Sequence, residues 1–447
     1  MIQQILFLII AGGASFYAFR QFMAIRQAIL LGQDEEVSGN STERWRNVLL
    51  VAFGQKKMFK RWIPAVFHLF IYVAFLFTQI ELIEIFIDGA FGVHRFFADK
   101  IGGLYNLILN TIEVLSVLAF VATFIFLARR NLLKIPRLYS LNGWPKLDAN
   151  LILIFEVVLL VAIFTMNGTD AVLQGIDPNH YPDTGTLAVS SWLGPALFGG
   201  LDEGTLVVLE RMGWWLHLGM VLIFLNYLPK SKHLHIMLAF PNTFFSRQKS
   251  RGEMDNMPEI MNEVKGMMGL TEDTGEVDMN EELPDFGAND VTGLSWIDLL
   301  GAYTCTECGR CTAVCPANTT GKQLSPRKIM MDIRDRADEV YTKIQSGNEE
   351  YKADSEKPLS KDNFSDDKSL FDYITREEIH ACTTCNACVE ACPVLINPLE
   401  PILKMRRYEI LTESAGPGDW LPMFNAIENS GAAWSMTIDR EAWTKAE

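Results

Sequence analysis

Eight cysteines are the residues of this chain whose types and spacing point most clearly to chemistry. All eight lie between residues 305 and 392 of the 447, in two segments with the same spacing, C-x2-C-x2-C-x3-C followed by proline. The first segment holds Cys305, Cys308, Cys311 and Cys315, and the second holds Cys382, Cys385, Cys388 and Cys392. This spacing is typical of proteins that bind two [4Fe–4S] clusters through thiolates.

The spacing also predicts how the thiolates divide between the clusters. In this pattern the first three cysteines bind one cluster and the fourth reaches the other cluster. The predicted ligand sets are Cys305, Cys308, Cys311 and Cys392 for cluster 1, and Cys382, Cys385, Cys388 and Cys315 for cluster 2. The alternative is zinc, which also binds C-x2-C pairs but has no use for the repeated third and fourth cysteines. The clustering excludes a secreted disulfide scaffold and favours a reducing compartment.

The composition indicates that part of this chain lies in a membrane. Hydrophobic residues make up 49% of the chain and charged residues only 21%, and five segments are apolar over about the 20 residues that a helix needs to cross the lipid core. The predicted spans are Ile5–Arg26, Pro64–Ile87, Asn106–Ala128, Leu151–Met166 and Leu206–Leu228. The net charge is −15, and no concentrated basic face is expected, so the prediction is a membrane protein without a nucleic-acid partner.

The loops between the spans differ in charge. Those after the first and third spans hold Arg26, Arg44, Arg46, Lys56, Lys57, Lys60 and Arg61, and Arg129, Arg130, Lys134, Arg137 and Lys146. The second loop has only Arg95 and Lys100, and Asn167–Thr205 has no basic residue. Because Lys and Arg accumulate on the cytoplasmic side, we predict an outer amino terminus and cysteine motifs in the cytoplasm, at a bacterial inner membrane.

Four parts are expected along the chain. They are a five-helix membrane domain at 1–240, an acidic linker at 241–293, a mainly helical ferredoxin domain at 294–412 and a partner-docking tail at 413–447. Ser325-Pro326 and Asn397-Pro398 are typical helix starts, and alternating β-branched runs are few. The predicted fold class is an all-α membrane bundle joined to a mainly helical dicluster ferredoxin domain.

Three histidines stand out in the membrane half. His68 lies one turn into the second span, and His217 and His235 are 18 residues apart. That separation is about five turns of α-helix, so the two imidazoles share one face if the helix continues through Pro229.

Around these histidines the chain resembles the haem b subunit of respiratory nitrate reductases, a five-helix family that includes the cytochrome subunit of heterodisulfide reductase. The matching segments are Phe67-His68, His217-Leu-Gly219 and Pro229 to Pro241. The family has two histidines ten apart on helix two and two histidines eighteen apart on helix five, but here Thr78 replaces the second one. The resemblance therefore implies one haem b, held by His68 and His235 on the cytoplasmic side, with His233 as the rival to His235.

The role of His217 stays open. It is a one-sided ligand of a second haem, a hydrogen-bond partner of a quinone or a core histidine. Carboxylates inside apolar spans are costly and often functional, and the candidates are Glu81, Glu84, Glu113 and Glu156. We predict that Glu156, the deepest, serves with His217 at a quinone and proton site, whereas interfacial solvation is an equal explanation for Glu81 and Glu84.

The cysteine half resembles the two-cluster ferredoxin domain of heterodisulfide-reductase-type proteins. The tail resembles the linker to a cysteine-rich catalytic domain in those proteins and in membrane-bound electron-transfer-flavoprotein:menaquinone oxidoreductases. This implies an oxidoreductase subunit that passes electrons to or from menaquinone, with a separate cysteine-rich catalytic subunit and an electron-transfer flavoprotein as partners. The alternatives are quinol-driven disulfide reduction, a haem-free tethered ferredoxin, and a redox sensor or assembly factor. Without a Gly-rich dinucleotide fingerprint, no NAD or flavin is expected.

Overall fold

The computed structural model describes residues 1–37, 39–133, 135–139, 143–250, 252–270, 286–353, 357–434 and 441–445. Within these ranges the regular structure is helical, with two isolated β-bridges, Gln33 to Ser295 and Lys352 to Phe364. Lys134, residues 271–285 of the predicted linker and residues 435–440 and 446–447 of the predicted tail lie outside the described residues.

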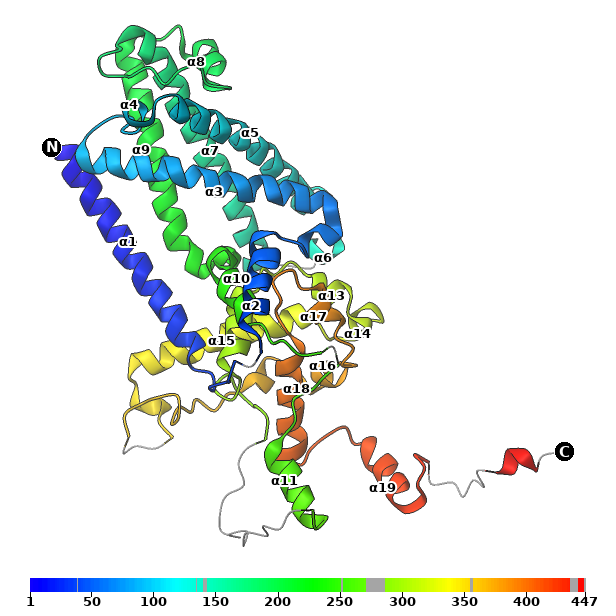
Figure 1. Ribbon diagram of the computed structural model, residues 1–447. Helices are drawn as coiled ribbons and strands as arrows, with labels where there is room; N and C mark the ends of the chain where they lie inside the picture. Colours follow the sequence, from blue (N-terminus) through cyan, green and yellow to red (C-terminus); the bar gives the residue numbers. More distant parts are fainter. Residues whose placement is uncertain are drawn as a thin grey trace.

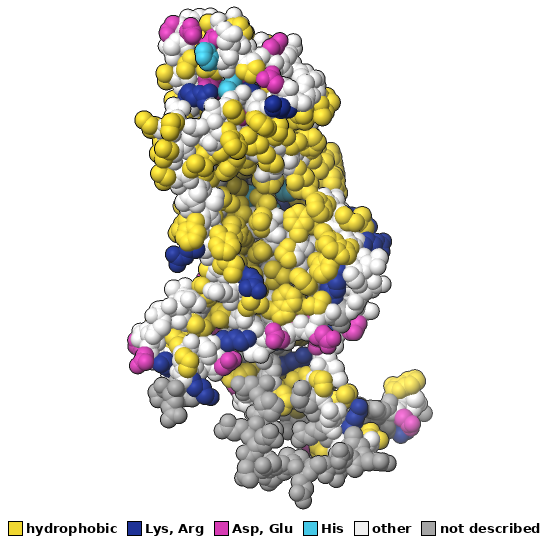
Figure 2. Space-filling view, turned by 60° about the vertical axis from the view of Figure 1, so that its left-hand side comes forward, with side chains coloured by type: hydrophobic (Ala, Val, Ile, Leu, Met, Phe, Trp, Pro, Cys, Tyr) yellow, Lys and Arg dark blue, Asp and Glu magenta, His cyan; other side chains and the backbone are white. Residues whose placement is uncertain are grey.

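Five of the described helices are long and apolar enough to cross a membrane. They are α1 (Ile2–Ile29), α3 (Trp62–Phe91), α5 (Gly103–Asn131), α7 (Trp144–Ile176) and α9 (Glu203–Tyr227). Figure 1 shows them forming one half of the molecule, and Figure 2 shows hydrophobic side chains covering the same half on the face it displays. The predicted fold class, five membrane helices joined to a helical dicluster region, is confirmed.

Short helices and turns lie at both ends of this bundle. At the end remote from the cysteine motifs lie α4 (Ala98–Ile101) and α8 (Ser190–Phe198). At the other end lie α2 (Ser41–Asn47), a π-helical turn (Val48–Phe53), a 3-10 turn (Met58–Arg61), α6 (Pro136–Tyr139) and α10 (His235–Phe244).

The helix that was expected to carry both His217 and His235 is broken. α9 ends at Tyr227, and 3-10 turns at Leu228–Lys230 and Lys232–Leu234 separate it from α10. Pro229 has no amide proton for a helical hydrogen bond, and Ser231 has an extended backbone with φ −114° and ψ 152°. The condition under which the two imidazoles would share one helix face, a helix that continues through Pro229, is therefore not met.

The dicluster half is built from short helices around one longer helix. They are α11 (Pro258–Met267), α12 (Trp296–Thr304), α13 (Arg310–Ala313), α14 (Pro316–Thr319), α15 (Pro326–Ser346), α16 (Arg376–His380), α17 (Ala387–Ala391), α18 (Leu399–Arg407) and α19 (Trp420–Ser430). The remaining turns are 3-10 turns at Glu349–Tyr351, Leu370–Asp372 and Ala442–Thr444, and a π-helical turn at Tyr408–Thr412.

The two halves share a hydrophobic core. Ile25, Ala28 and Ile29 at the inner end of α1 belong to the same buried cluster as Leu294 and Ile333 of the dicluster half. The chain then passes very close to the start of α12, because a Cβ on Gly32 would lie 2.6 Å from the backbone of Ser295. α1 is therefore both a membrane helix and an anchor for the dicluster half.

The region expected to be a linker is partly structured. It contains α11, and residues 286–293 pack into the dicluster core, where Val291 is fully buried. The amide of Ala288 donates to the carbonyl of Lys404, and Asp290 accepts two hydrogen bonds from the Arg336 guanidinium. Lys404 and Arg336 are distant in sequence from these residues. The sequence of residues 286–293 has no periodicity of its own, so they were assigned to the linker.

Arg336 is a buried cation of the dicluster half that needs carboxylate partners. It is fully buried and pairs with Asp290 at 2.6 Å and Asp366 at 2.7 Å.

Replacing one partner of a buried ion pair leaves the other charge uncompensated and costs about 3–5 kcal/mol. We expect Arg336→Met to lower the urea midpoint for loss of visible iron–sulfur absorbance by a corresponding amount. Lys368→Met, at a side chain that is 49% exposed, is the control and should shift the midpoint little.

Candidate electron-transfer site

The two cysteine motifs have the same backbone shape. In the first, Glu307 (φ 52°) and Gly309 (φ 70°) adopt left-handed conformations on either side of Cys308. In the second, Thr384 (φ 54°) and Asn386 (φ 59°) do the same on either side of Cys385. A left-handed conformation is uncommon for a residue other than glycine, so its recurrence at the same two motif positions indicates a loop shaped to present its thiols in one direction.

The thiols fall into two neighbouring groups. Cys311 lies within electrostatic range of Cys305, Cys308 and Cys392, and a weaker interaction reaches Cys388. Cys388 in turn lies within range of Cys382, Cys315 and Cys385. Each group thus contains three cysteines of one motif and the fourth of the other.

Burial opposes ionisation of these thiols unless a positive group is present. Burial raises the pKa of Cys305 and of Cys388 to about 12, and that of Cys392 to about 11. A coordinating metal deprotonates a thiol outright. The donor set and the buried surroundings therefore fit iron–sulfur clusters, whose iron binds the cysteines as thiolates.

Zinc does not suit this arrangement. Among the described residues, no three His, Cys, Asp or Glu side chains are placed to hold one metal ion. A structural zinc ion needs four ligands within about 2.3 Å of one point. A [4Fe–4S] cluster is bound by four thiolates over a larger body, and that spread agrees with the two groups of neighbouring thiols.

The first motif is attached to the membrane half. The Lys232 ammonium forms an ion pair with Glu307 at 2.7 Å and donates to the carbonyl of Pro145 at 2.6 Å. Arg137 of α6 donates to the carbonyl of Cys308 at 2.7 Å, and Arg310 donates to the carbonyl of Lys57 at 3.1 Å. Glu307, Cys308 and Arg310 of the first motif thus contact three separate segments of the membrane half.

The second motif is more exposed. It contains the exposed Cys385, whereas the four cysteines of the first motif are buried or half-buried. α13 and α17, which contain Cys311 and Cys388, the third cysteine of each motif, pack together (Figure 1). The two sites therefore lie side by side, and the first is the one held against the membrane half by Lys232 and Arg137.

Two predicted haem ligands lie close to the first motif. His68 on α3 is within electrostatic range of His235 and of Arg310. Nδ1 of His68 is 3.1 Å from Oε1 of Gln55, and Nδ1 of His235 is 2.9 Å from the carbonyl of Lys232. Each Nδ1–H can donate to its oxygen, which leaves Nε2 as the ligand atom, the usual arrangement of metal-binding histidines.

His233 lacks this orientation. Its ring lies 5.4 Å from that of His235, and its buried Nδ1 has no hydrogen-bond partner among the described residues. The donor set of His68 and His235 fits axial ligation of a haem, and that of His233 fits less well.

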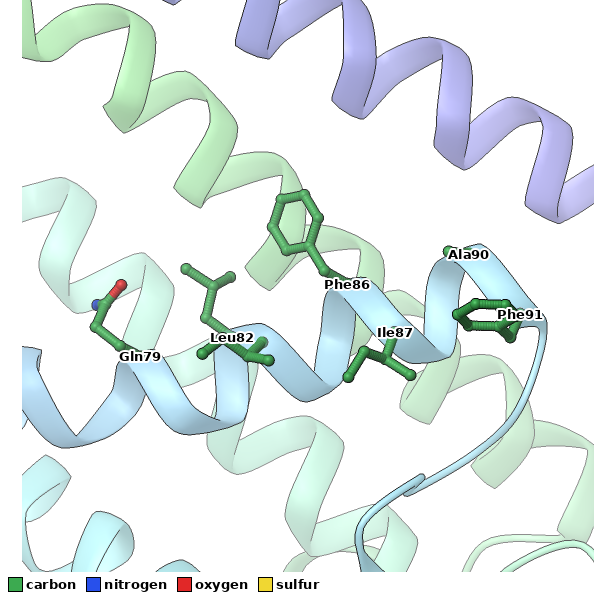
Figure 3. Close-up of a pocket in the computed structure, with 7 residues that line it drawn as sticks. Gln79, Leu82, Phe86, Ile87, Ala90 and Phe91 are labelled. Atoms are coloured by element: carbon green, nitrogen blue, oxygen red, sulfur yellow. The ribbon is translucent and has the colours of Figure 1, made fainter.

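The structure does not bring Glu156 and His217 together with the pocket of the membrane half. His217 is buried on α9 near the backbone of Leu159 on α7, and its Nδ1 has no hydrogen-bond partner among the described residues. Among the described residues Glu156 forms no hydrogen bond or ion pair. A groove of about 410 Å³ is lined by α3 residues from Gln79 to Phe91 and contains neither side chain (Figure 3).

Sequence reasoning missed the residues that attach and orient the site. Gln55 and Lys232 are distant in sequence from their partners His68 and Glu307. The available signal was the segment Lys230-Ser-Lys232 directly after the last predicted span, and it indicates a buried ion pair only when the neighbours of Lys232 in space are known.

Comparison with known proteins supports the cluster assignment. Residues 304–396 match the family of 4Fe-4S dicluster domains. The chain is 29% identical over 464 residues to a probable iron-sulfur-binding oxidoreductase, FadF, of Bacillus subtilis, covering 98% of this chain and 60% of that protein. It is 25% identical over 335 residues to the EtfAB:quinone oxidoreductase of Syntrophomonas wolfei, covering 73% and 43%. No solved structure matches.

A third relative is a probable membrane-anchored ferredoxin of Chromohalobacter salexigens, 31% identical over 170 residues, which cover 36% of this chain and 24% of that protein. The chain spans 60% or less of the length of each of these relatives. This chain is a multi-pass membrane protein with a 4Fe–4S dicluster domain. It binds two such clusters through its cysteine motifs.

The exchange of the fourth cysteine between motifs is testable. Cys392→Ala should lose the same cluster as Cys308→Ala, and Cys315→Ala the same cluster as Cys385→Ala, because the thiols neighbour one another in those sets. Each variant should lose about four irons per chain. Iron analysis and electron paramagnetic resonance of the dithionite-reduced protein measure this. A Cys392→Ala spectrum identical to that of Cys385→Ala would contradict the pairing.

Proposed function

We propose that this chain is the membrane-embedded electron-transfer subunit of a quinone-linked oxidoreductase, exchanging electrons between a soluble partner and menaquinone. The observation that carries the proposal is the attachment of the Glu307–Arg310 segment to the membrane half beside His68 and His235. It links a thiol-lined site to a pair of oriented imidazoles at the start of the bundle.

In this proposal each cofactor is held by named side chains. Cys305, Cys308, Cys311 and Cys392 hold cluster 1, Cys382, Cys385, Cys388 and Cys315 hold cluster 2, and His68 and His235 hold one haem b. When bound, these groups supply one-electron transfer, and the protein supplies their positions and surroundings. Lys232 and Arg137 fix the first motif against the membrane half, and the buried thiols of Cys305 and Cys392 keep water from cluster 1.

The loop charges support an orientation in which the dicluster domain faces the cytoplasm of a bacterial inner membrane. Arg137, Lys232 and the other basic residues near the first motif lie at the dicluster end, whereas Asp177, Asp183 and Asp202 lie at the remote end. Such an asymmetry is typical of cytoplasmic and outer surfaces respectively.

A soluble partner would deliver electrons at the second motif. Trp420 of α19 packs against His380, two residues before Cys382, with ring centroids 5.1 Å apart. Leu421 and Phe424 on the same helix are 66% and 52% exposed, and exposed apolar side chains of this size are typical of docking surfaces. The name of the Syntrophomonas relative supports an electron-transfer flavoprotein as donor. The resemblance of the tail to the linker of heterodisulfide-reductase-like proteins supports a cysteine-rich catalytic unit as the intermediate partner.

The function is tested by oxidation of the reduced protein with quinone. Under anaerobic conditions, the full chain reduced by dithionite and freed of excess reductant should recover its oxidised absorbance on addition of a short-chain naphthoquinone. Stopped-flow spectroscopy follows the iron–sulfur band. A protein that keeps its clusters reduced in the presence of excess quinone would overturn the proposal and favour a tethered ferredoxin or a redox sensor.

The haem assignment is tested separately. His68→Ala and His235→Ala should each abolish a b-type absorbance band in the reduced spectrum while retaining the iron–sulfur clusters, because each removes one axial ligand. His233→Ala is the matched control, since its ring lies beside that of His235 but its Nδ1 is not oriented, and it should keep the band. Loss of haem in His233→Ala but not in His235→Ala would reverse the assignment.

A further inference from the structure

A buried group of charged side chains lies at the end of the bundle remote from the cysteine motifs. We call it the Arg95 cluster, and its members are Glu81, Glu84 and Asp88 of α3, His94 and Arg95 of the following loop, Asp170 of α7, and Glu210 and Arg211 of α9. The five carboxylate residues are 8% exposed or less. None of them takes part in holding the clusters or the proposed haem.

Arg95 lies at the centre of this cluster. Its guanidinium forms ion pairs with Glu81 at 3.5 Å, with Glu84 at 4.0 Å and with Asp170 at 3.4 Å. It also donates to Oδ1 of Asn167 at 2.5 Å. A single cation thus faces carboxylates from two membrane helices.

The carboxylates differ in how well they are satisfied. Glu84 accepts hydrogen bonds from the Tyr105 hydroxyl at 2.6 Å and the Phe97 amide at 2.8 Å, and Asp88 accepts from the backbone amides of Arg95 and Phe96. In contrast, neither carboxylate oxygen of Glu81 has a hydrogen-bond partner of good geometry among the described residues, although the residue is only 2% exposed. Glu84 and Asp88 therefore have structural roles that Glu81 lacks.

The cluster holds more carboxylates than cations. Its five carboxylates face two guanidiniums, and an uncompensated charge in a low-dielectric interior is so costly that the group takes up a proton instead. The Arg95 cluster can therefore store and release protons inside the bundle.

His94 connects the cluster to the surface. Because arginine can only donate, the contact of 3.2 Å between Arg211 Nη2 and His94 Nδ1 makes Nδ1 the acceptor. Nε2 then donates to Asp170 Oδ1 at 2.8 Å. The side chains of His94 and Arg211 are 15% and 36% exposed, so this pair lies between the buried carboxylates and the solvent.

At the other side Glu81 lies deepest. It is ten residues before the end of α3 at Phe91, which corresponds to roughly 15 Å along the helix at 1.5 Å per residue. The groups that face it are Glu84 on its own helix, Glu113 on α5, Arg95 on the loop and Asn167 on α7. Glu81 is thus the member of the cluster that extends furthest toward the lipid interior.

We propose that the Arg95 cluster exchanges protons between a quinone bound in the membrane and the aqueous phase remote from the dicluster domain, with Glu81 as its inner end and His94 as its outer end. This inference rests on the proposed quinone-linked function. Reduction of one quinone consumes two electrons, supplied through the iron–sulfur clusters, and two protons, and oxidation of the quinol returns both. Glu81 gives or takes each proton as a carboxylic acid, and the Asp170–His94 pair restores its protonation state from water.

The experiment compares Glu81→Gln with Glu113→Gln. Glu113 is also a buried glutamate near this end, 1% exposed, but it accepts hydrogen bonds from the Val189 and Ser190 amides and anchors the start of α8. The full chain, loaded with its clusters, is reconstituted in vesicles that trap a pH dye, and the oxidation of reduced clusters by a short-chain naphthoquinone is followed together with the dye.

We expect Glu81→Gln to slow quinone-dependent oxidation at least tenfold and to remove the matching pH change in the compartment that the Arg95 cluster faces. Glu113→Gln should retain both, and Glu81→Asp should recover part of the rate. His94→Gln, which keeps a donor to Asp170 but cannot relay a proton, should slow the reaction most at high pH, where protons are scarce.

Each outcome is informative. Wild-type rates and pH changes in Glu81→Gln, with normal cluster content, would overturn the proton role while leaving the quinone function intact. Failure of the wild-type protein to react with quinone would overturn the proposed function and this inference with it. If Glu81→Gln does not fold, His94→Gln at the partly exposed end of the cluster decides the question, and an unchanged pH profile in that variant overturns the proposal.

Discussion

The attachment of the first cysteine motif to the membrane half is the constraint on which the remaining structure depends. Glu307 and the carbonyl of Cys308 are held by Lys232, which follows the last membrane helix, and by Arg137, which lies between α5 and α7. These bonds are charge-assisted and mostly buried, and such bonds are stronger than neutral ones. They place a thiol-lined site beside His68 and His235, so the site and the bundle cannot move independently.

Buried charge is used differently at the two ends of the bundle. In the dicluster half both oxygens of Asp290 and of Asp366 accept hydrogen bonds from Arg336, and the effect is to fix positions. At the remote end of the bundle the carboxylates of the Arg95 cluster outnumber its guanidiniums, and among the described residues Glu81 has no hydrogen-bond partner of good geometry. A satisfied network makes a structure rigid, whereas an incompletely satisfied one is costly to keep unless it has a function.

The sequence predicted the parts of the molecule that depend on local pattern. The cysteine spacing identified the dicluster domain, and apolar length identified the membrane helices. The predictions from sequence failed where residues distant in the chain determine the structure. α7 continues past Met166, where Asp170 pairs with Arg95 and His94. Residues 286–293 are ordered through contacts with Lys404 and Arg336. α9 ends at Tyr227 because of Pro229, which is a local sequence signal. The prediction had given more weight to the 18-residue spacing of His217 and His235 than to this proline. The cysteine pairing and the haem ligands remain predictions.

The central claim is that one chain carries iron–sulfur clusters on a membrane bundle that also holds a haem. The measurement that tests it most directly is the content of iron, acid-labile sulfide, haem and zinc in one anaerobically purified sample of the full chain. The account predicts about eight cluster irons and eight sulfides per chain, as two [4Fe–4S] clusters require, together with about one haem b and no zinc. A sample that contains zinc in place of iron, or iron and sulfide without haem, would contradict it.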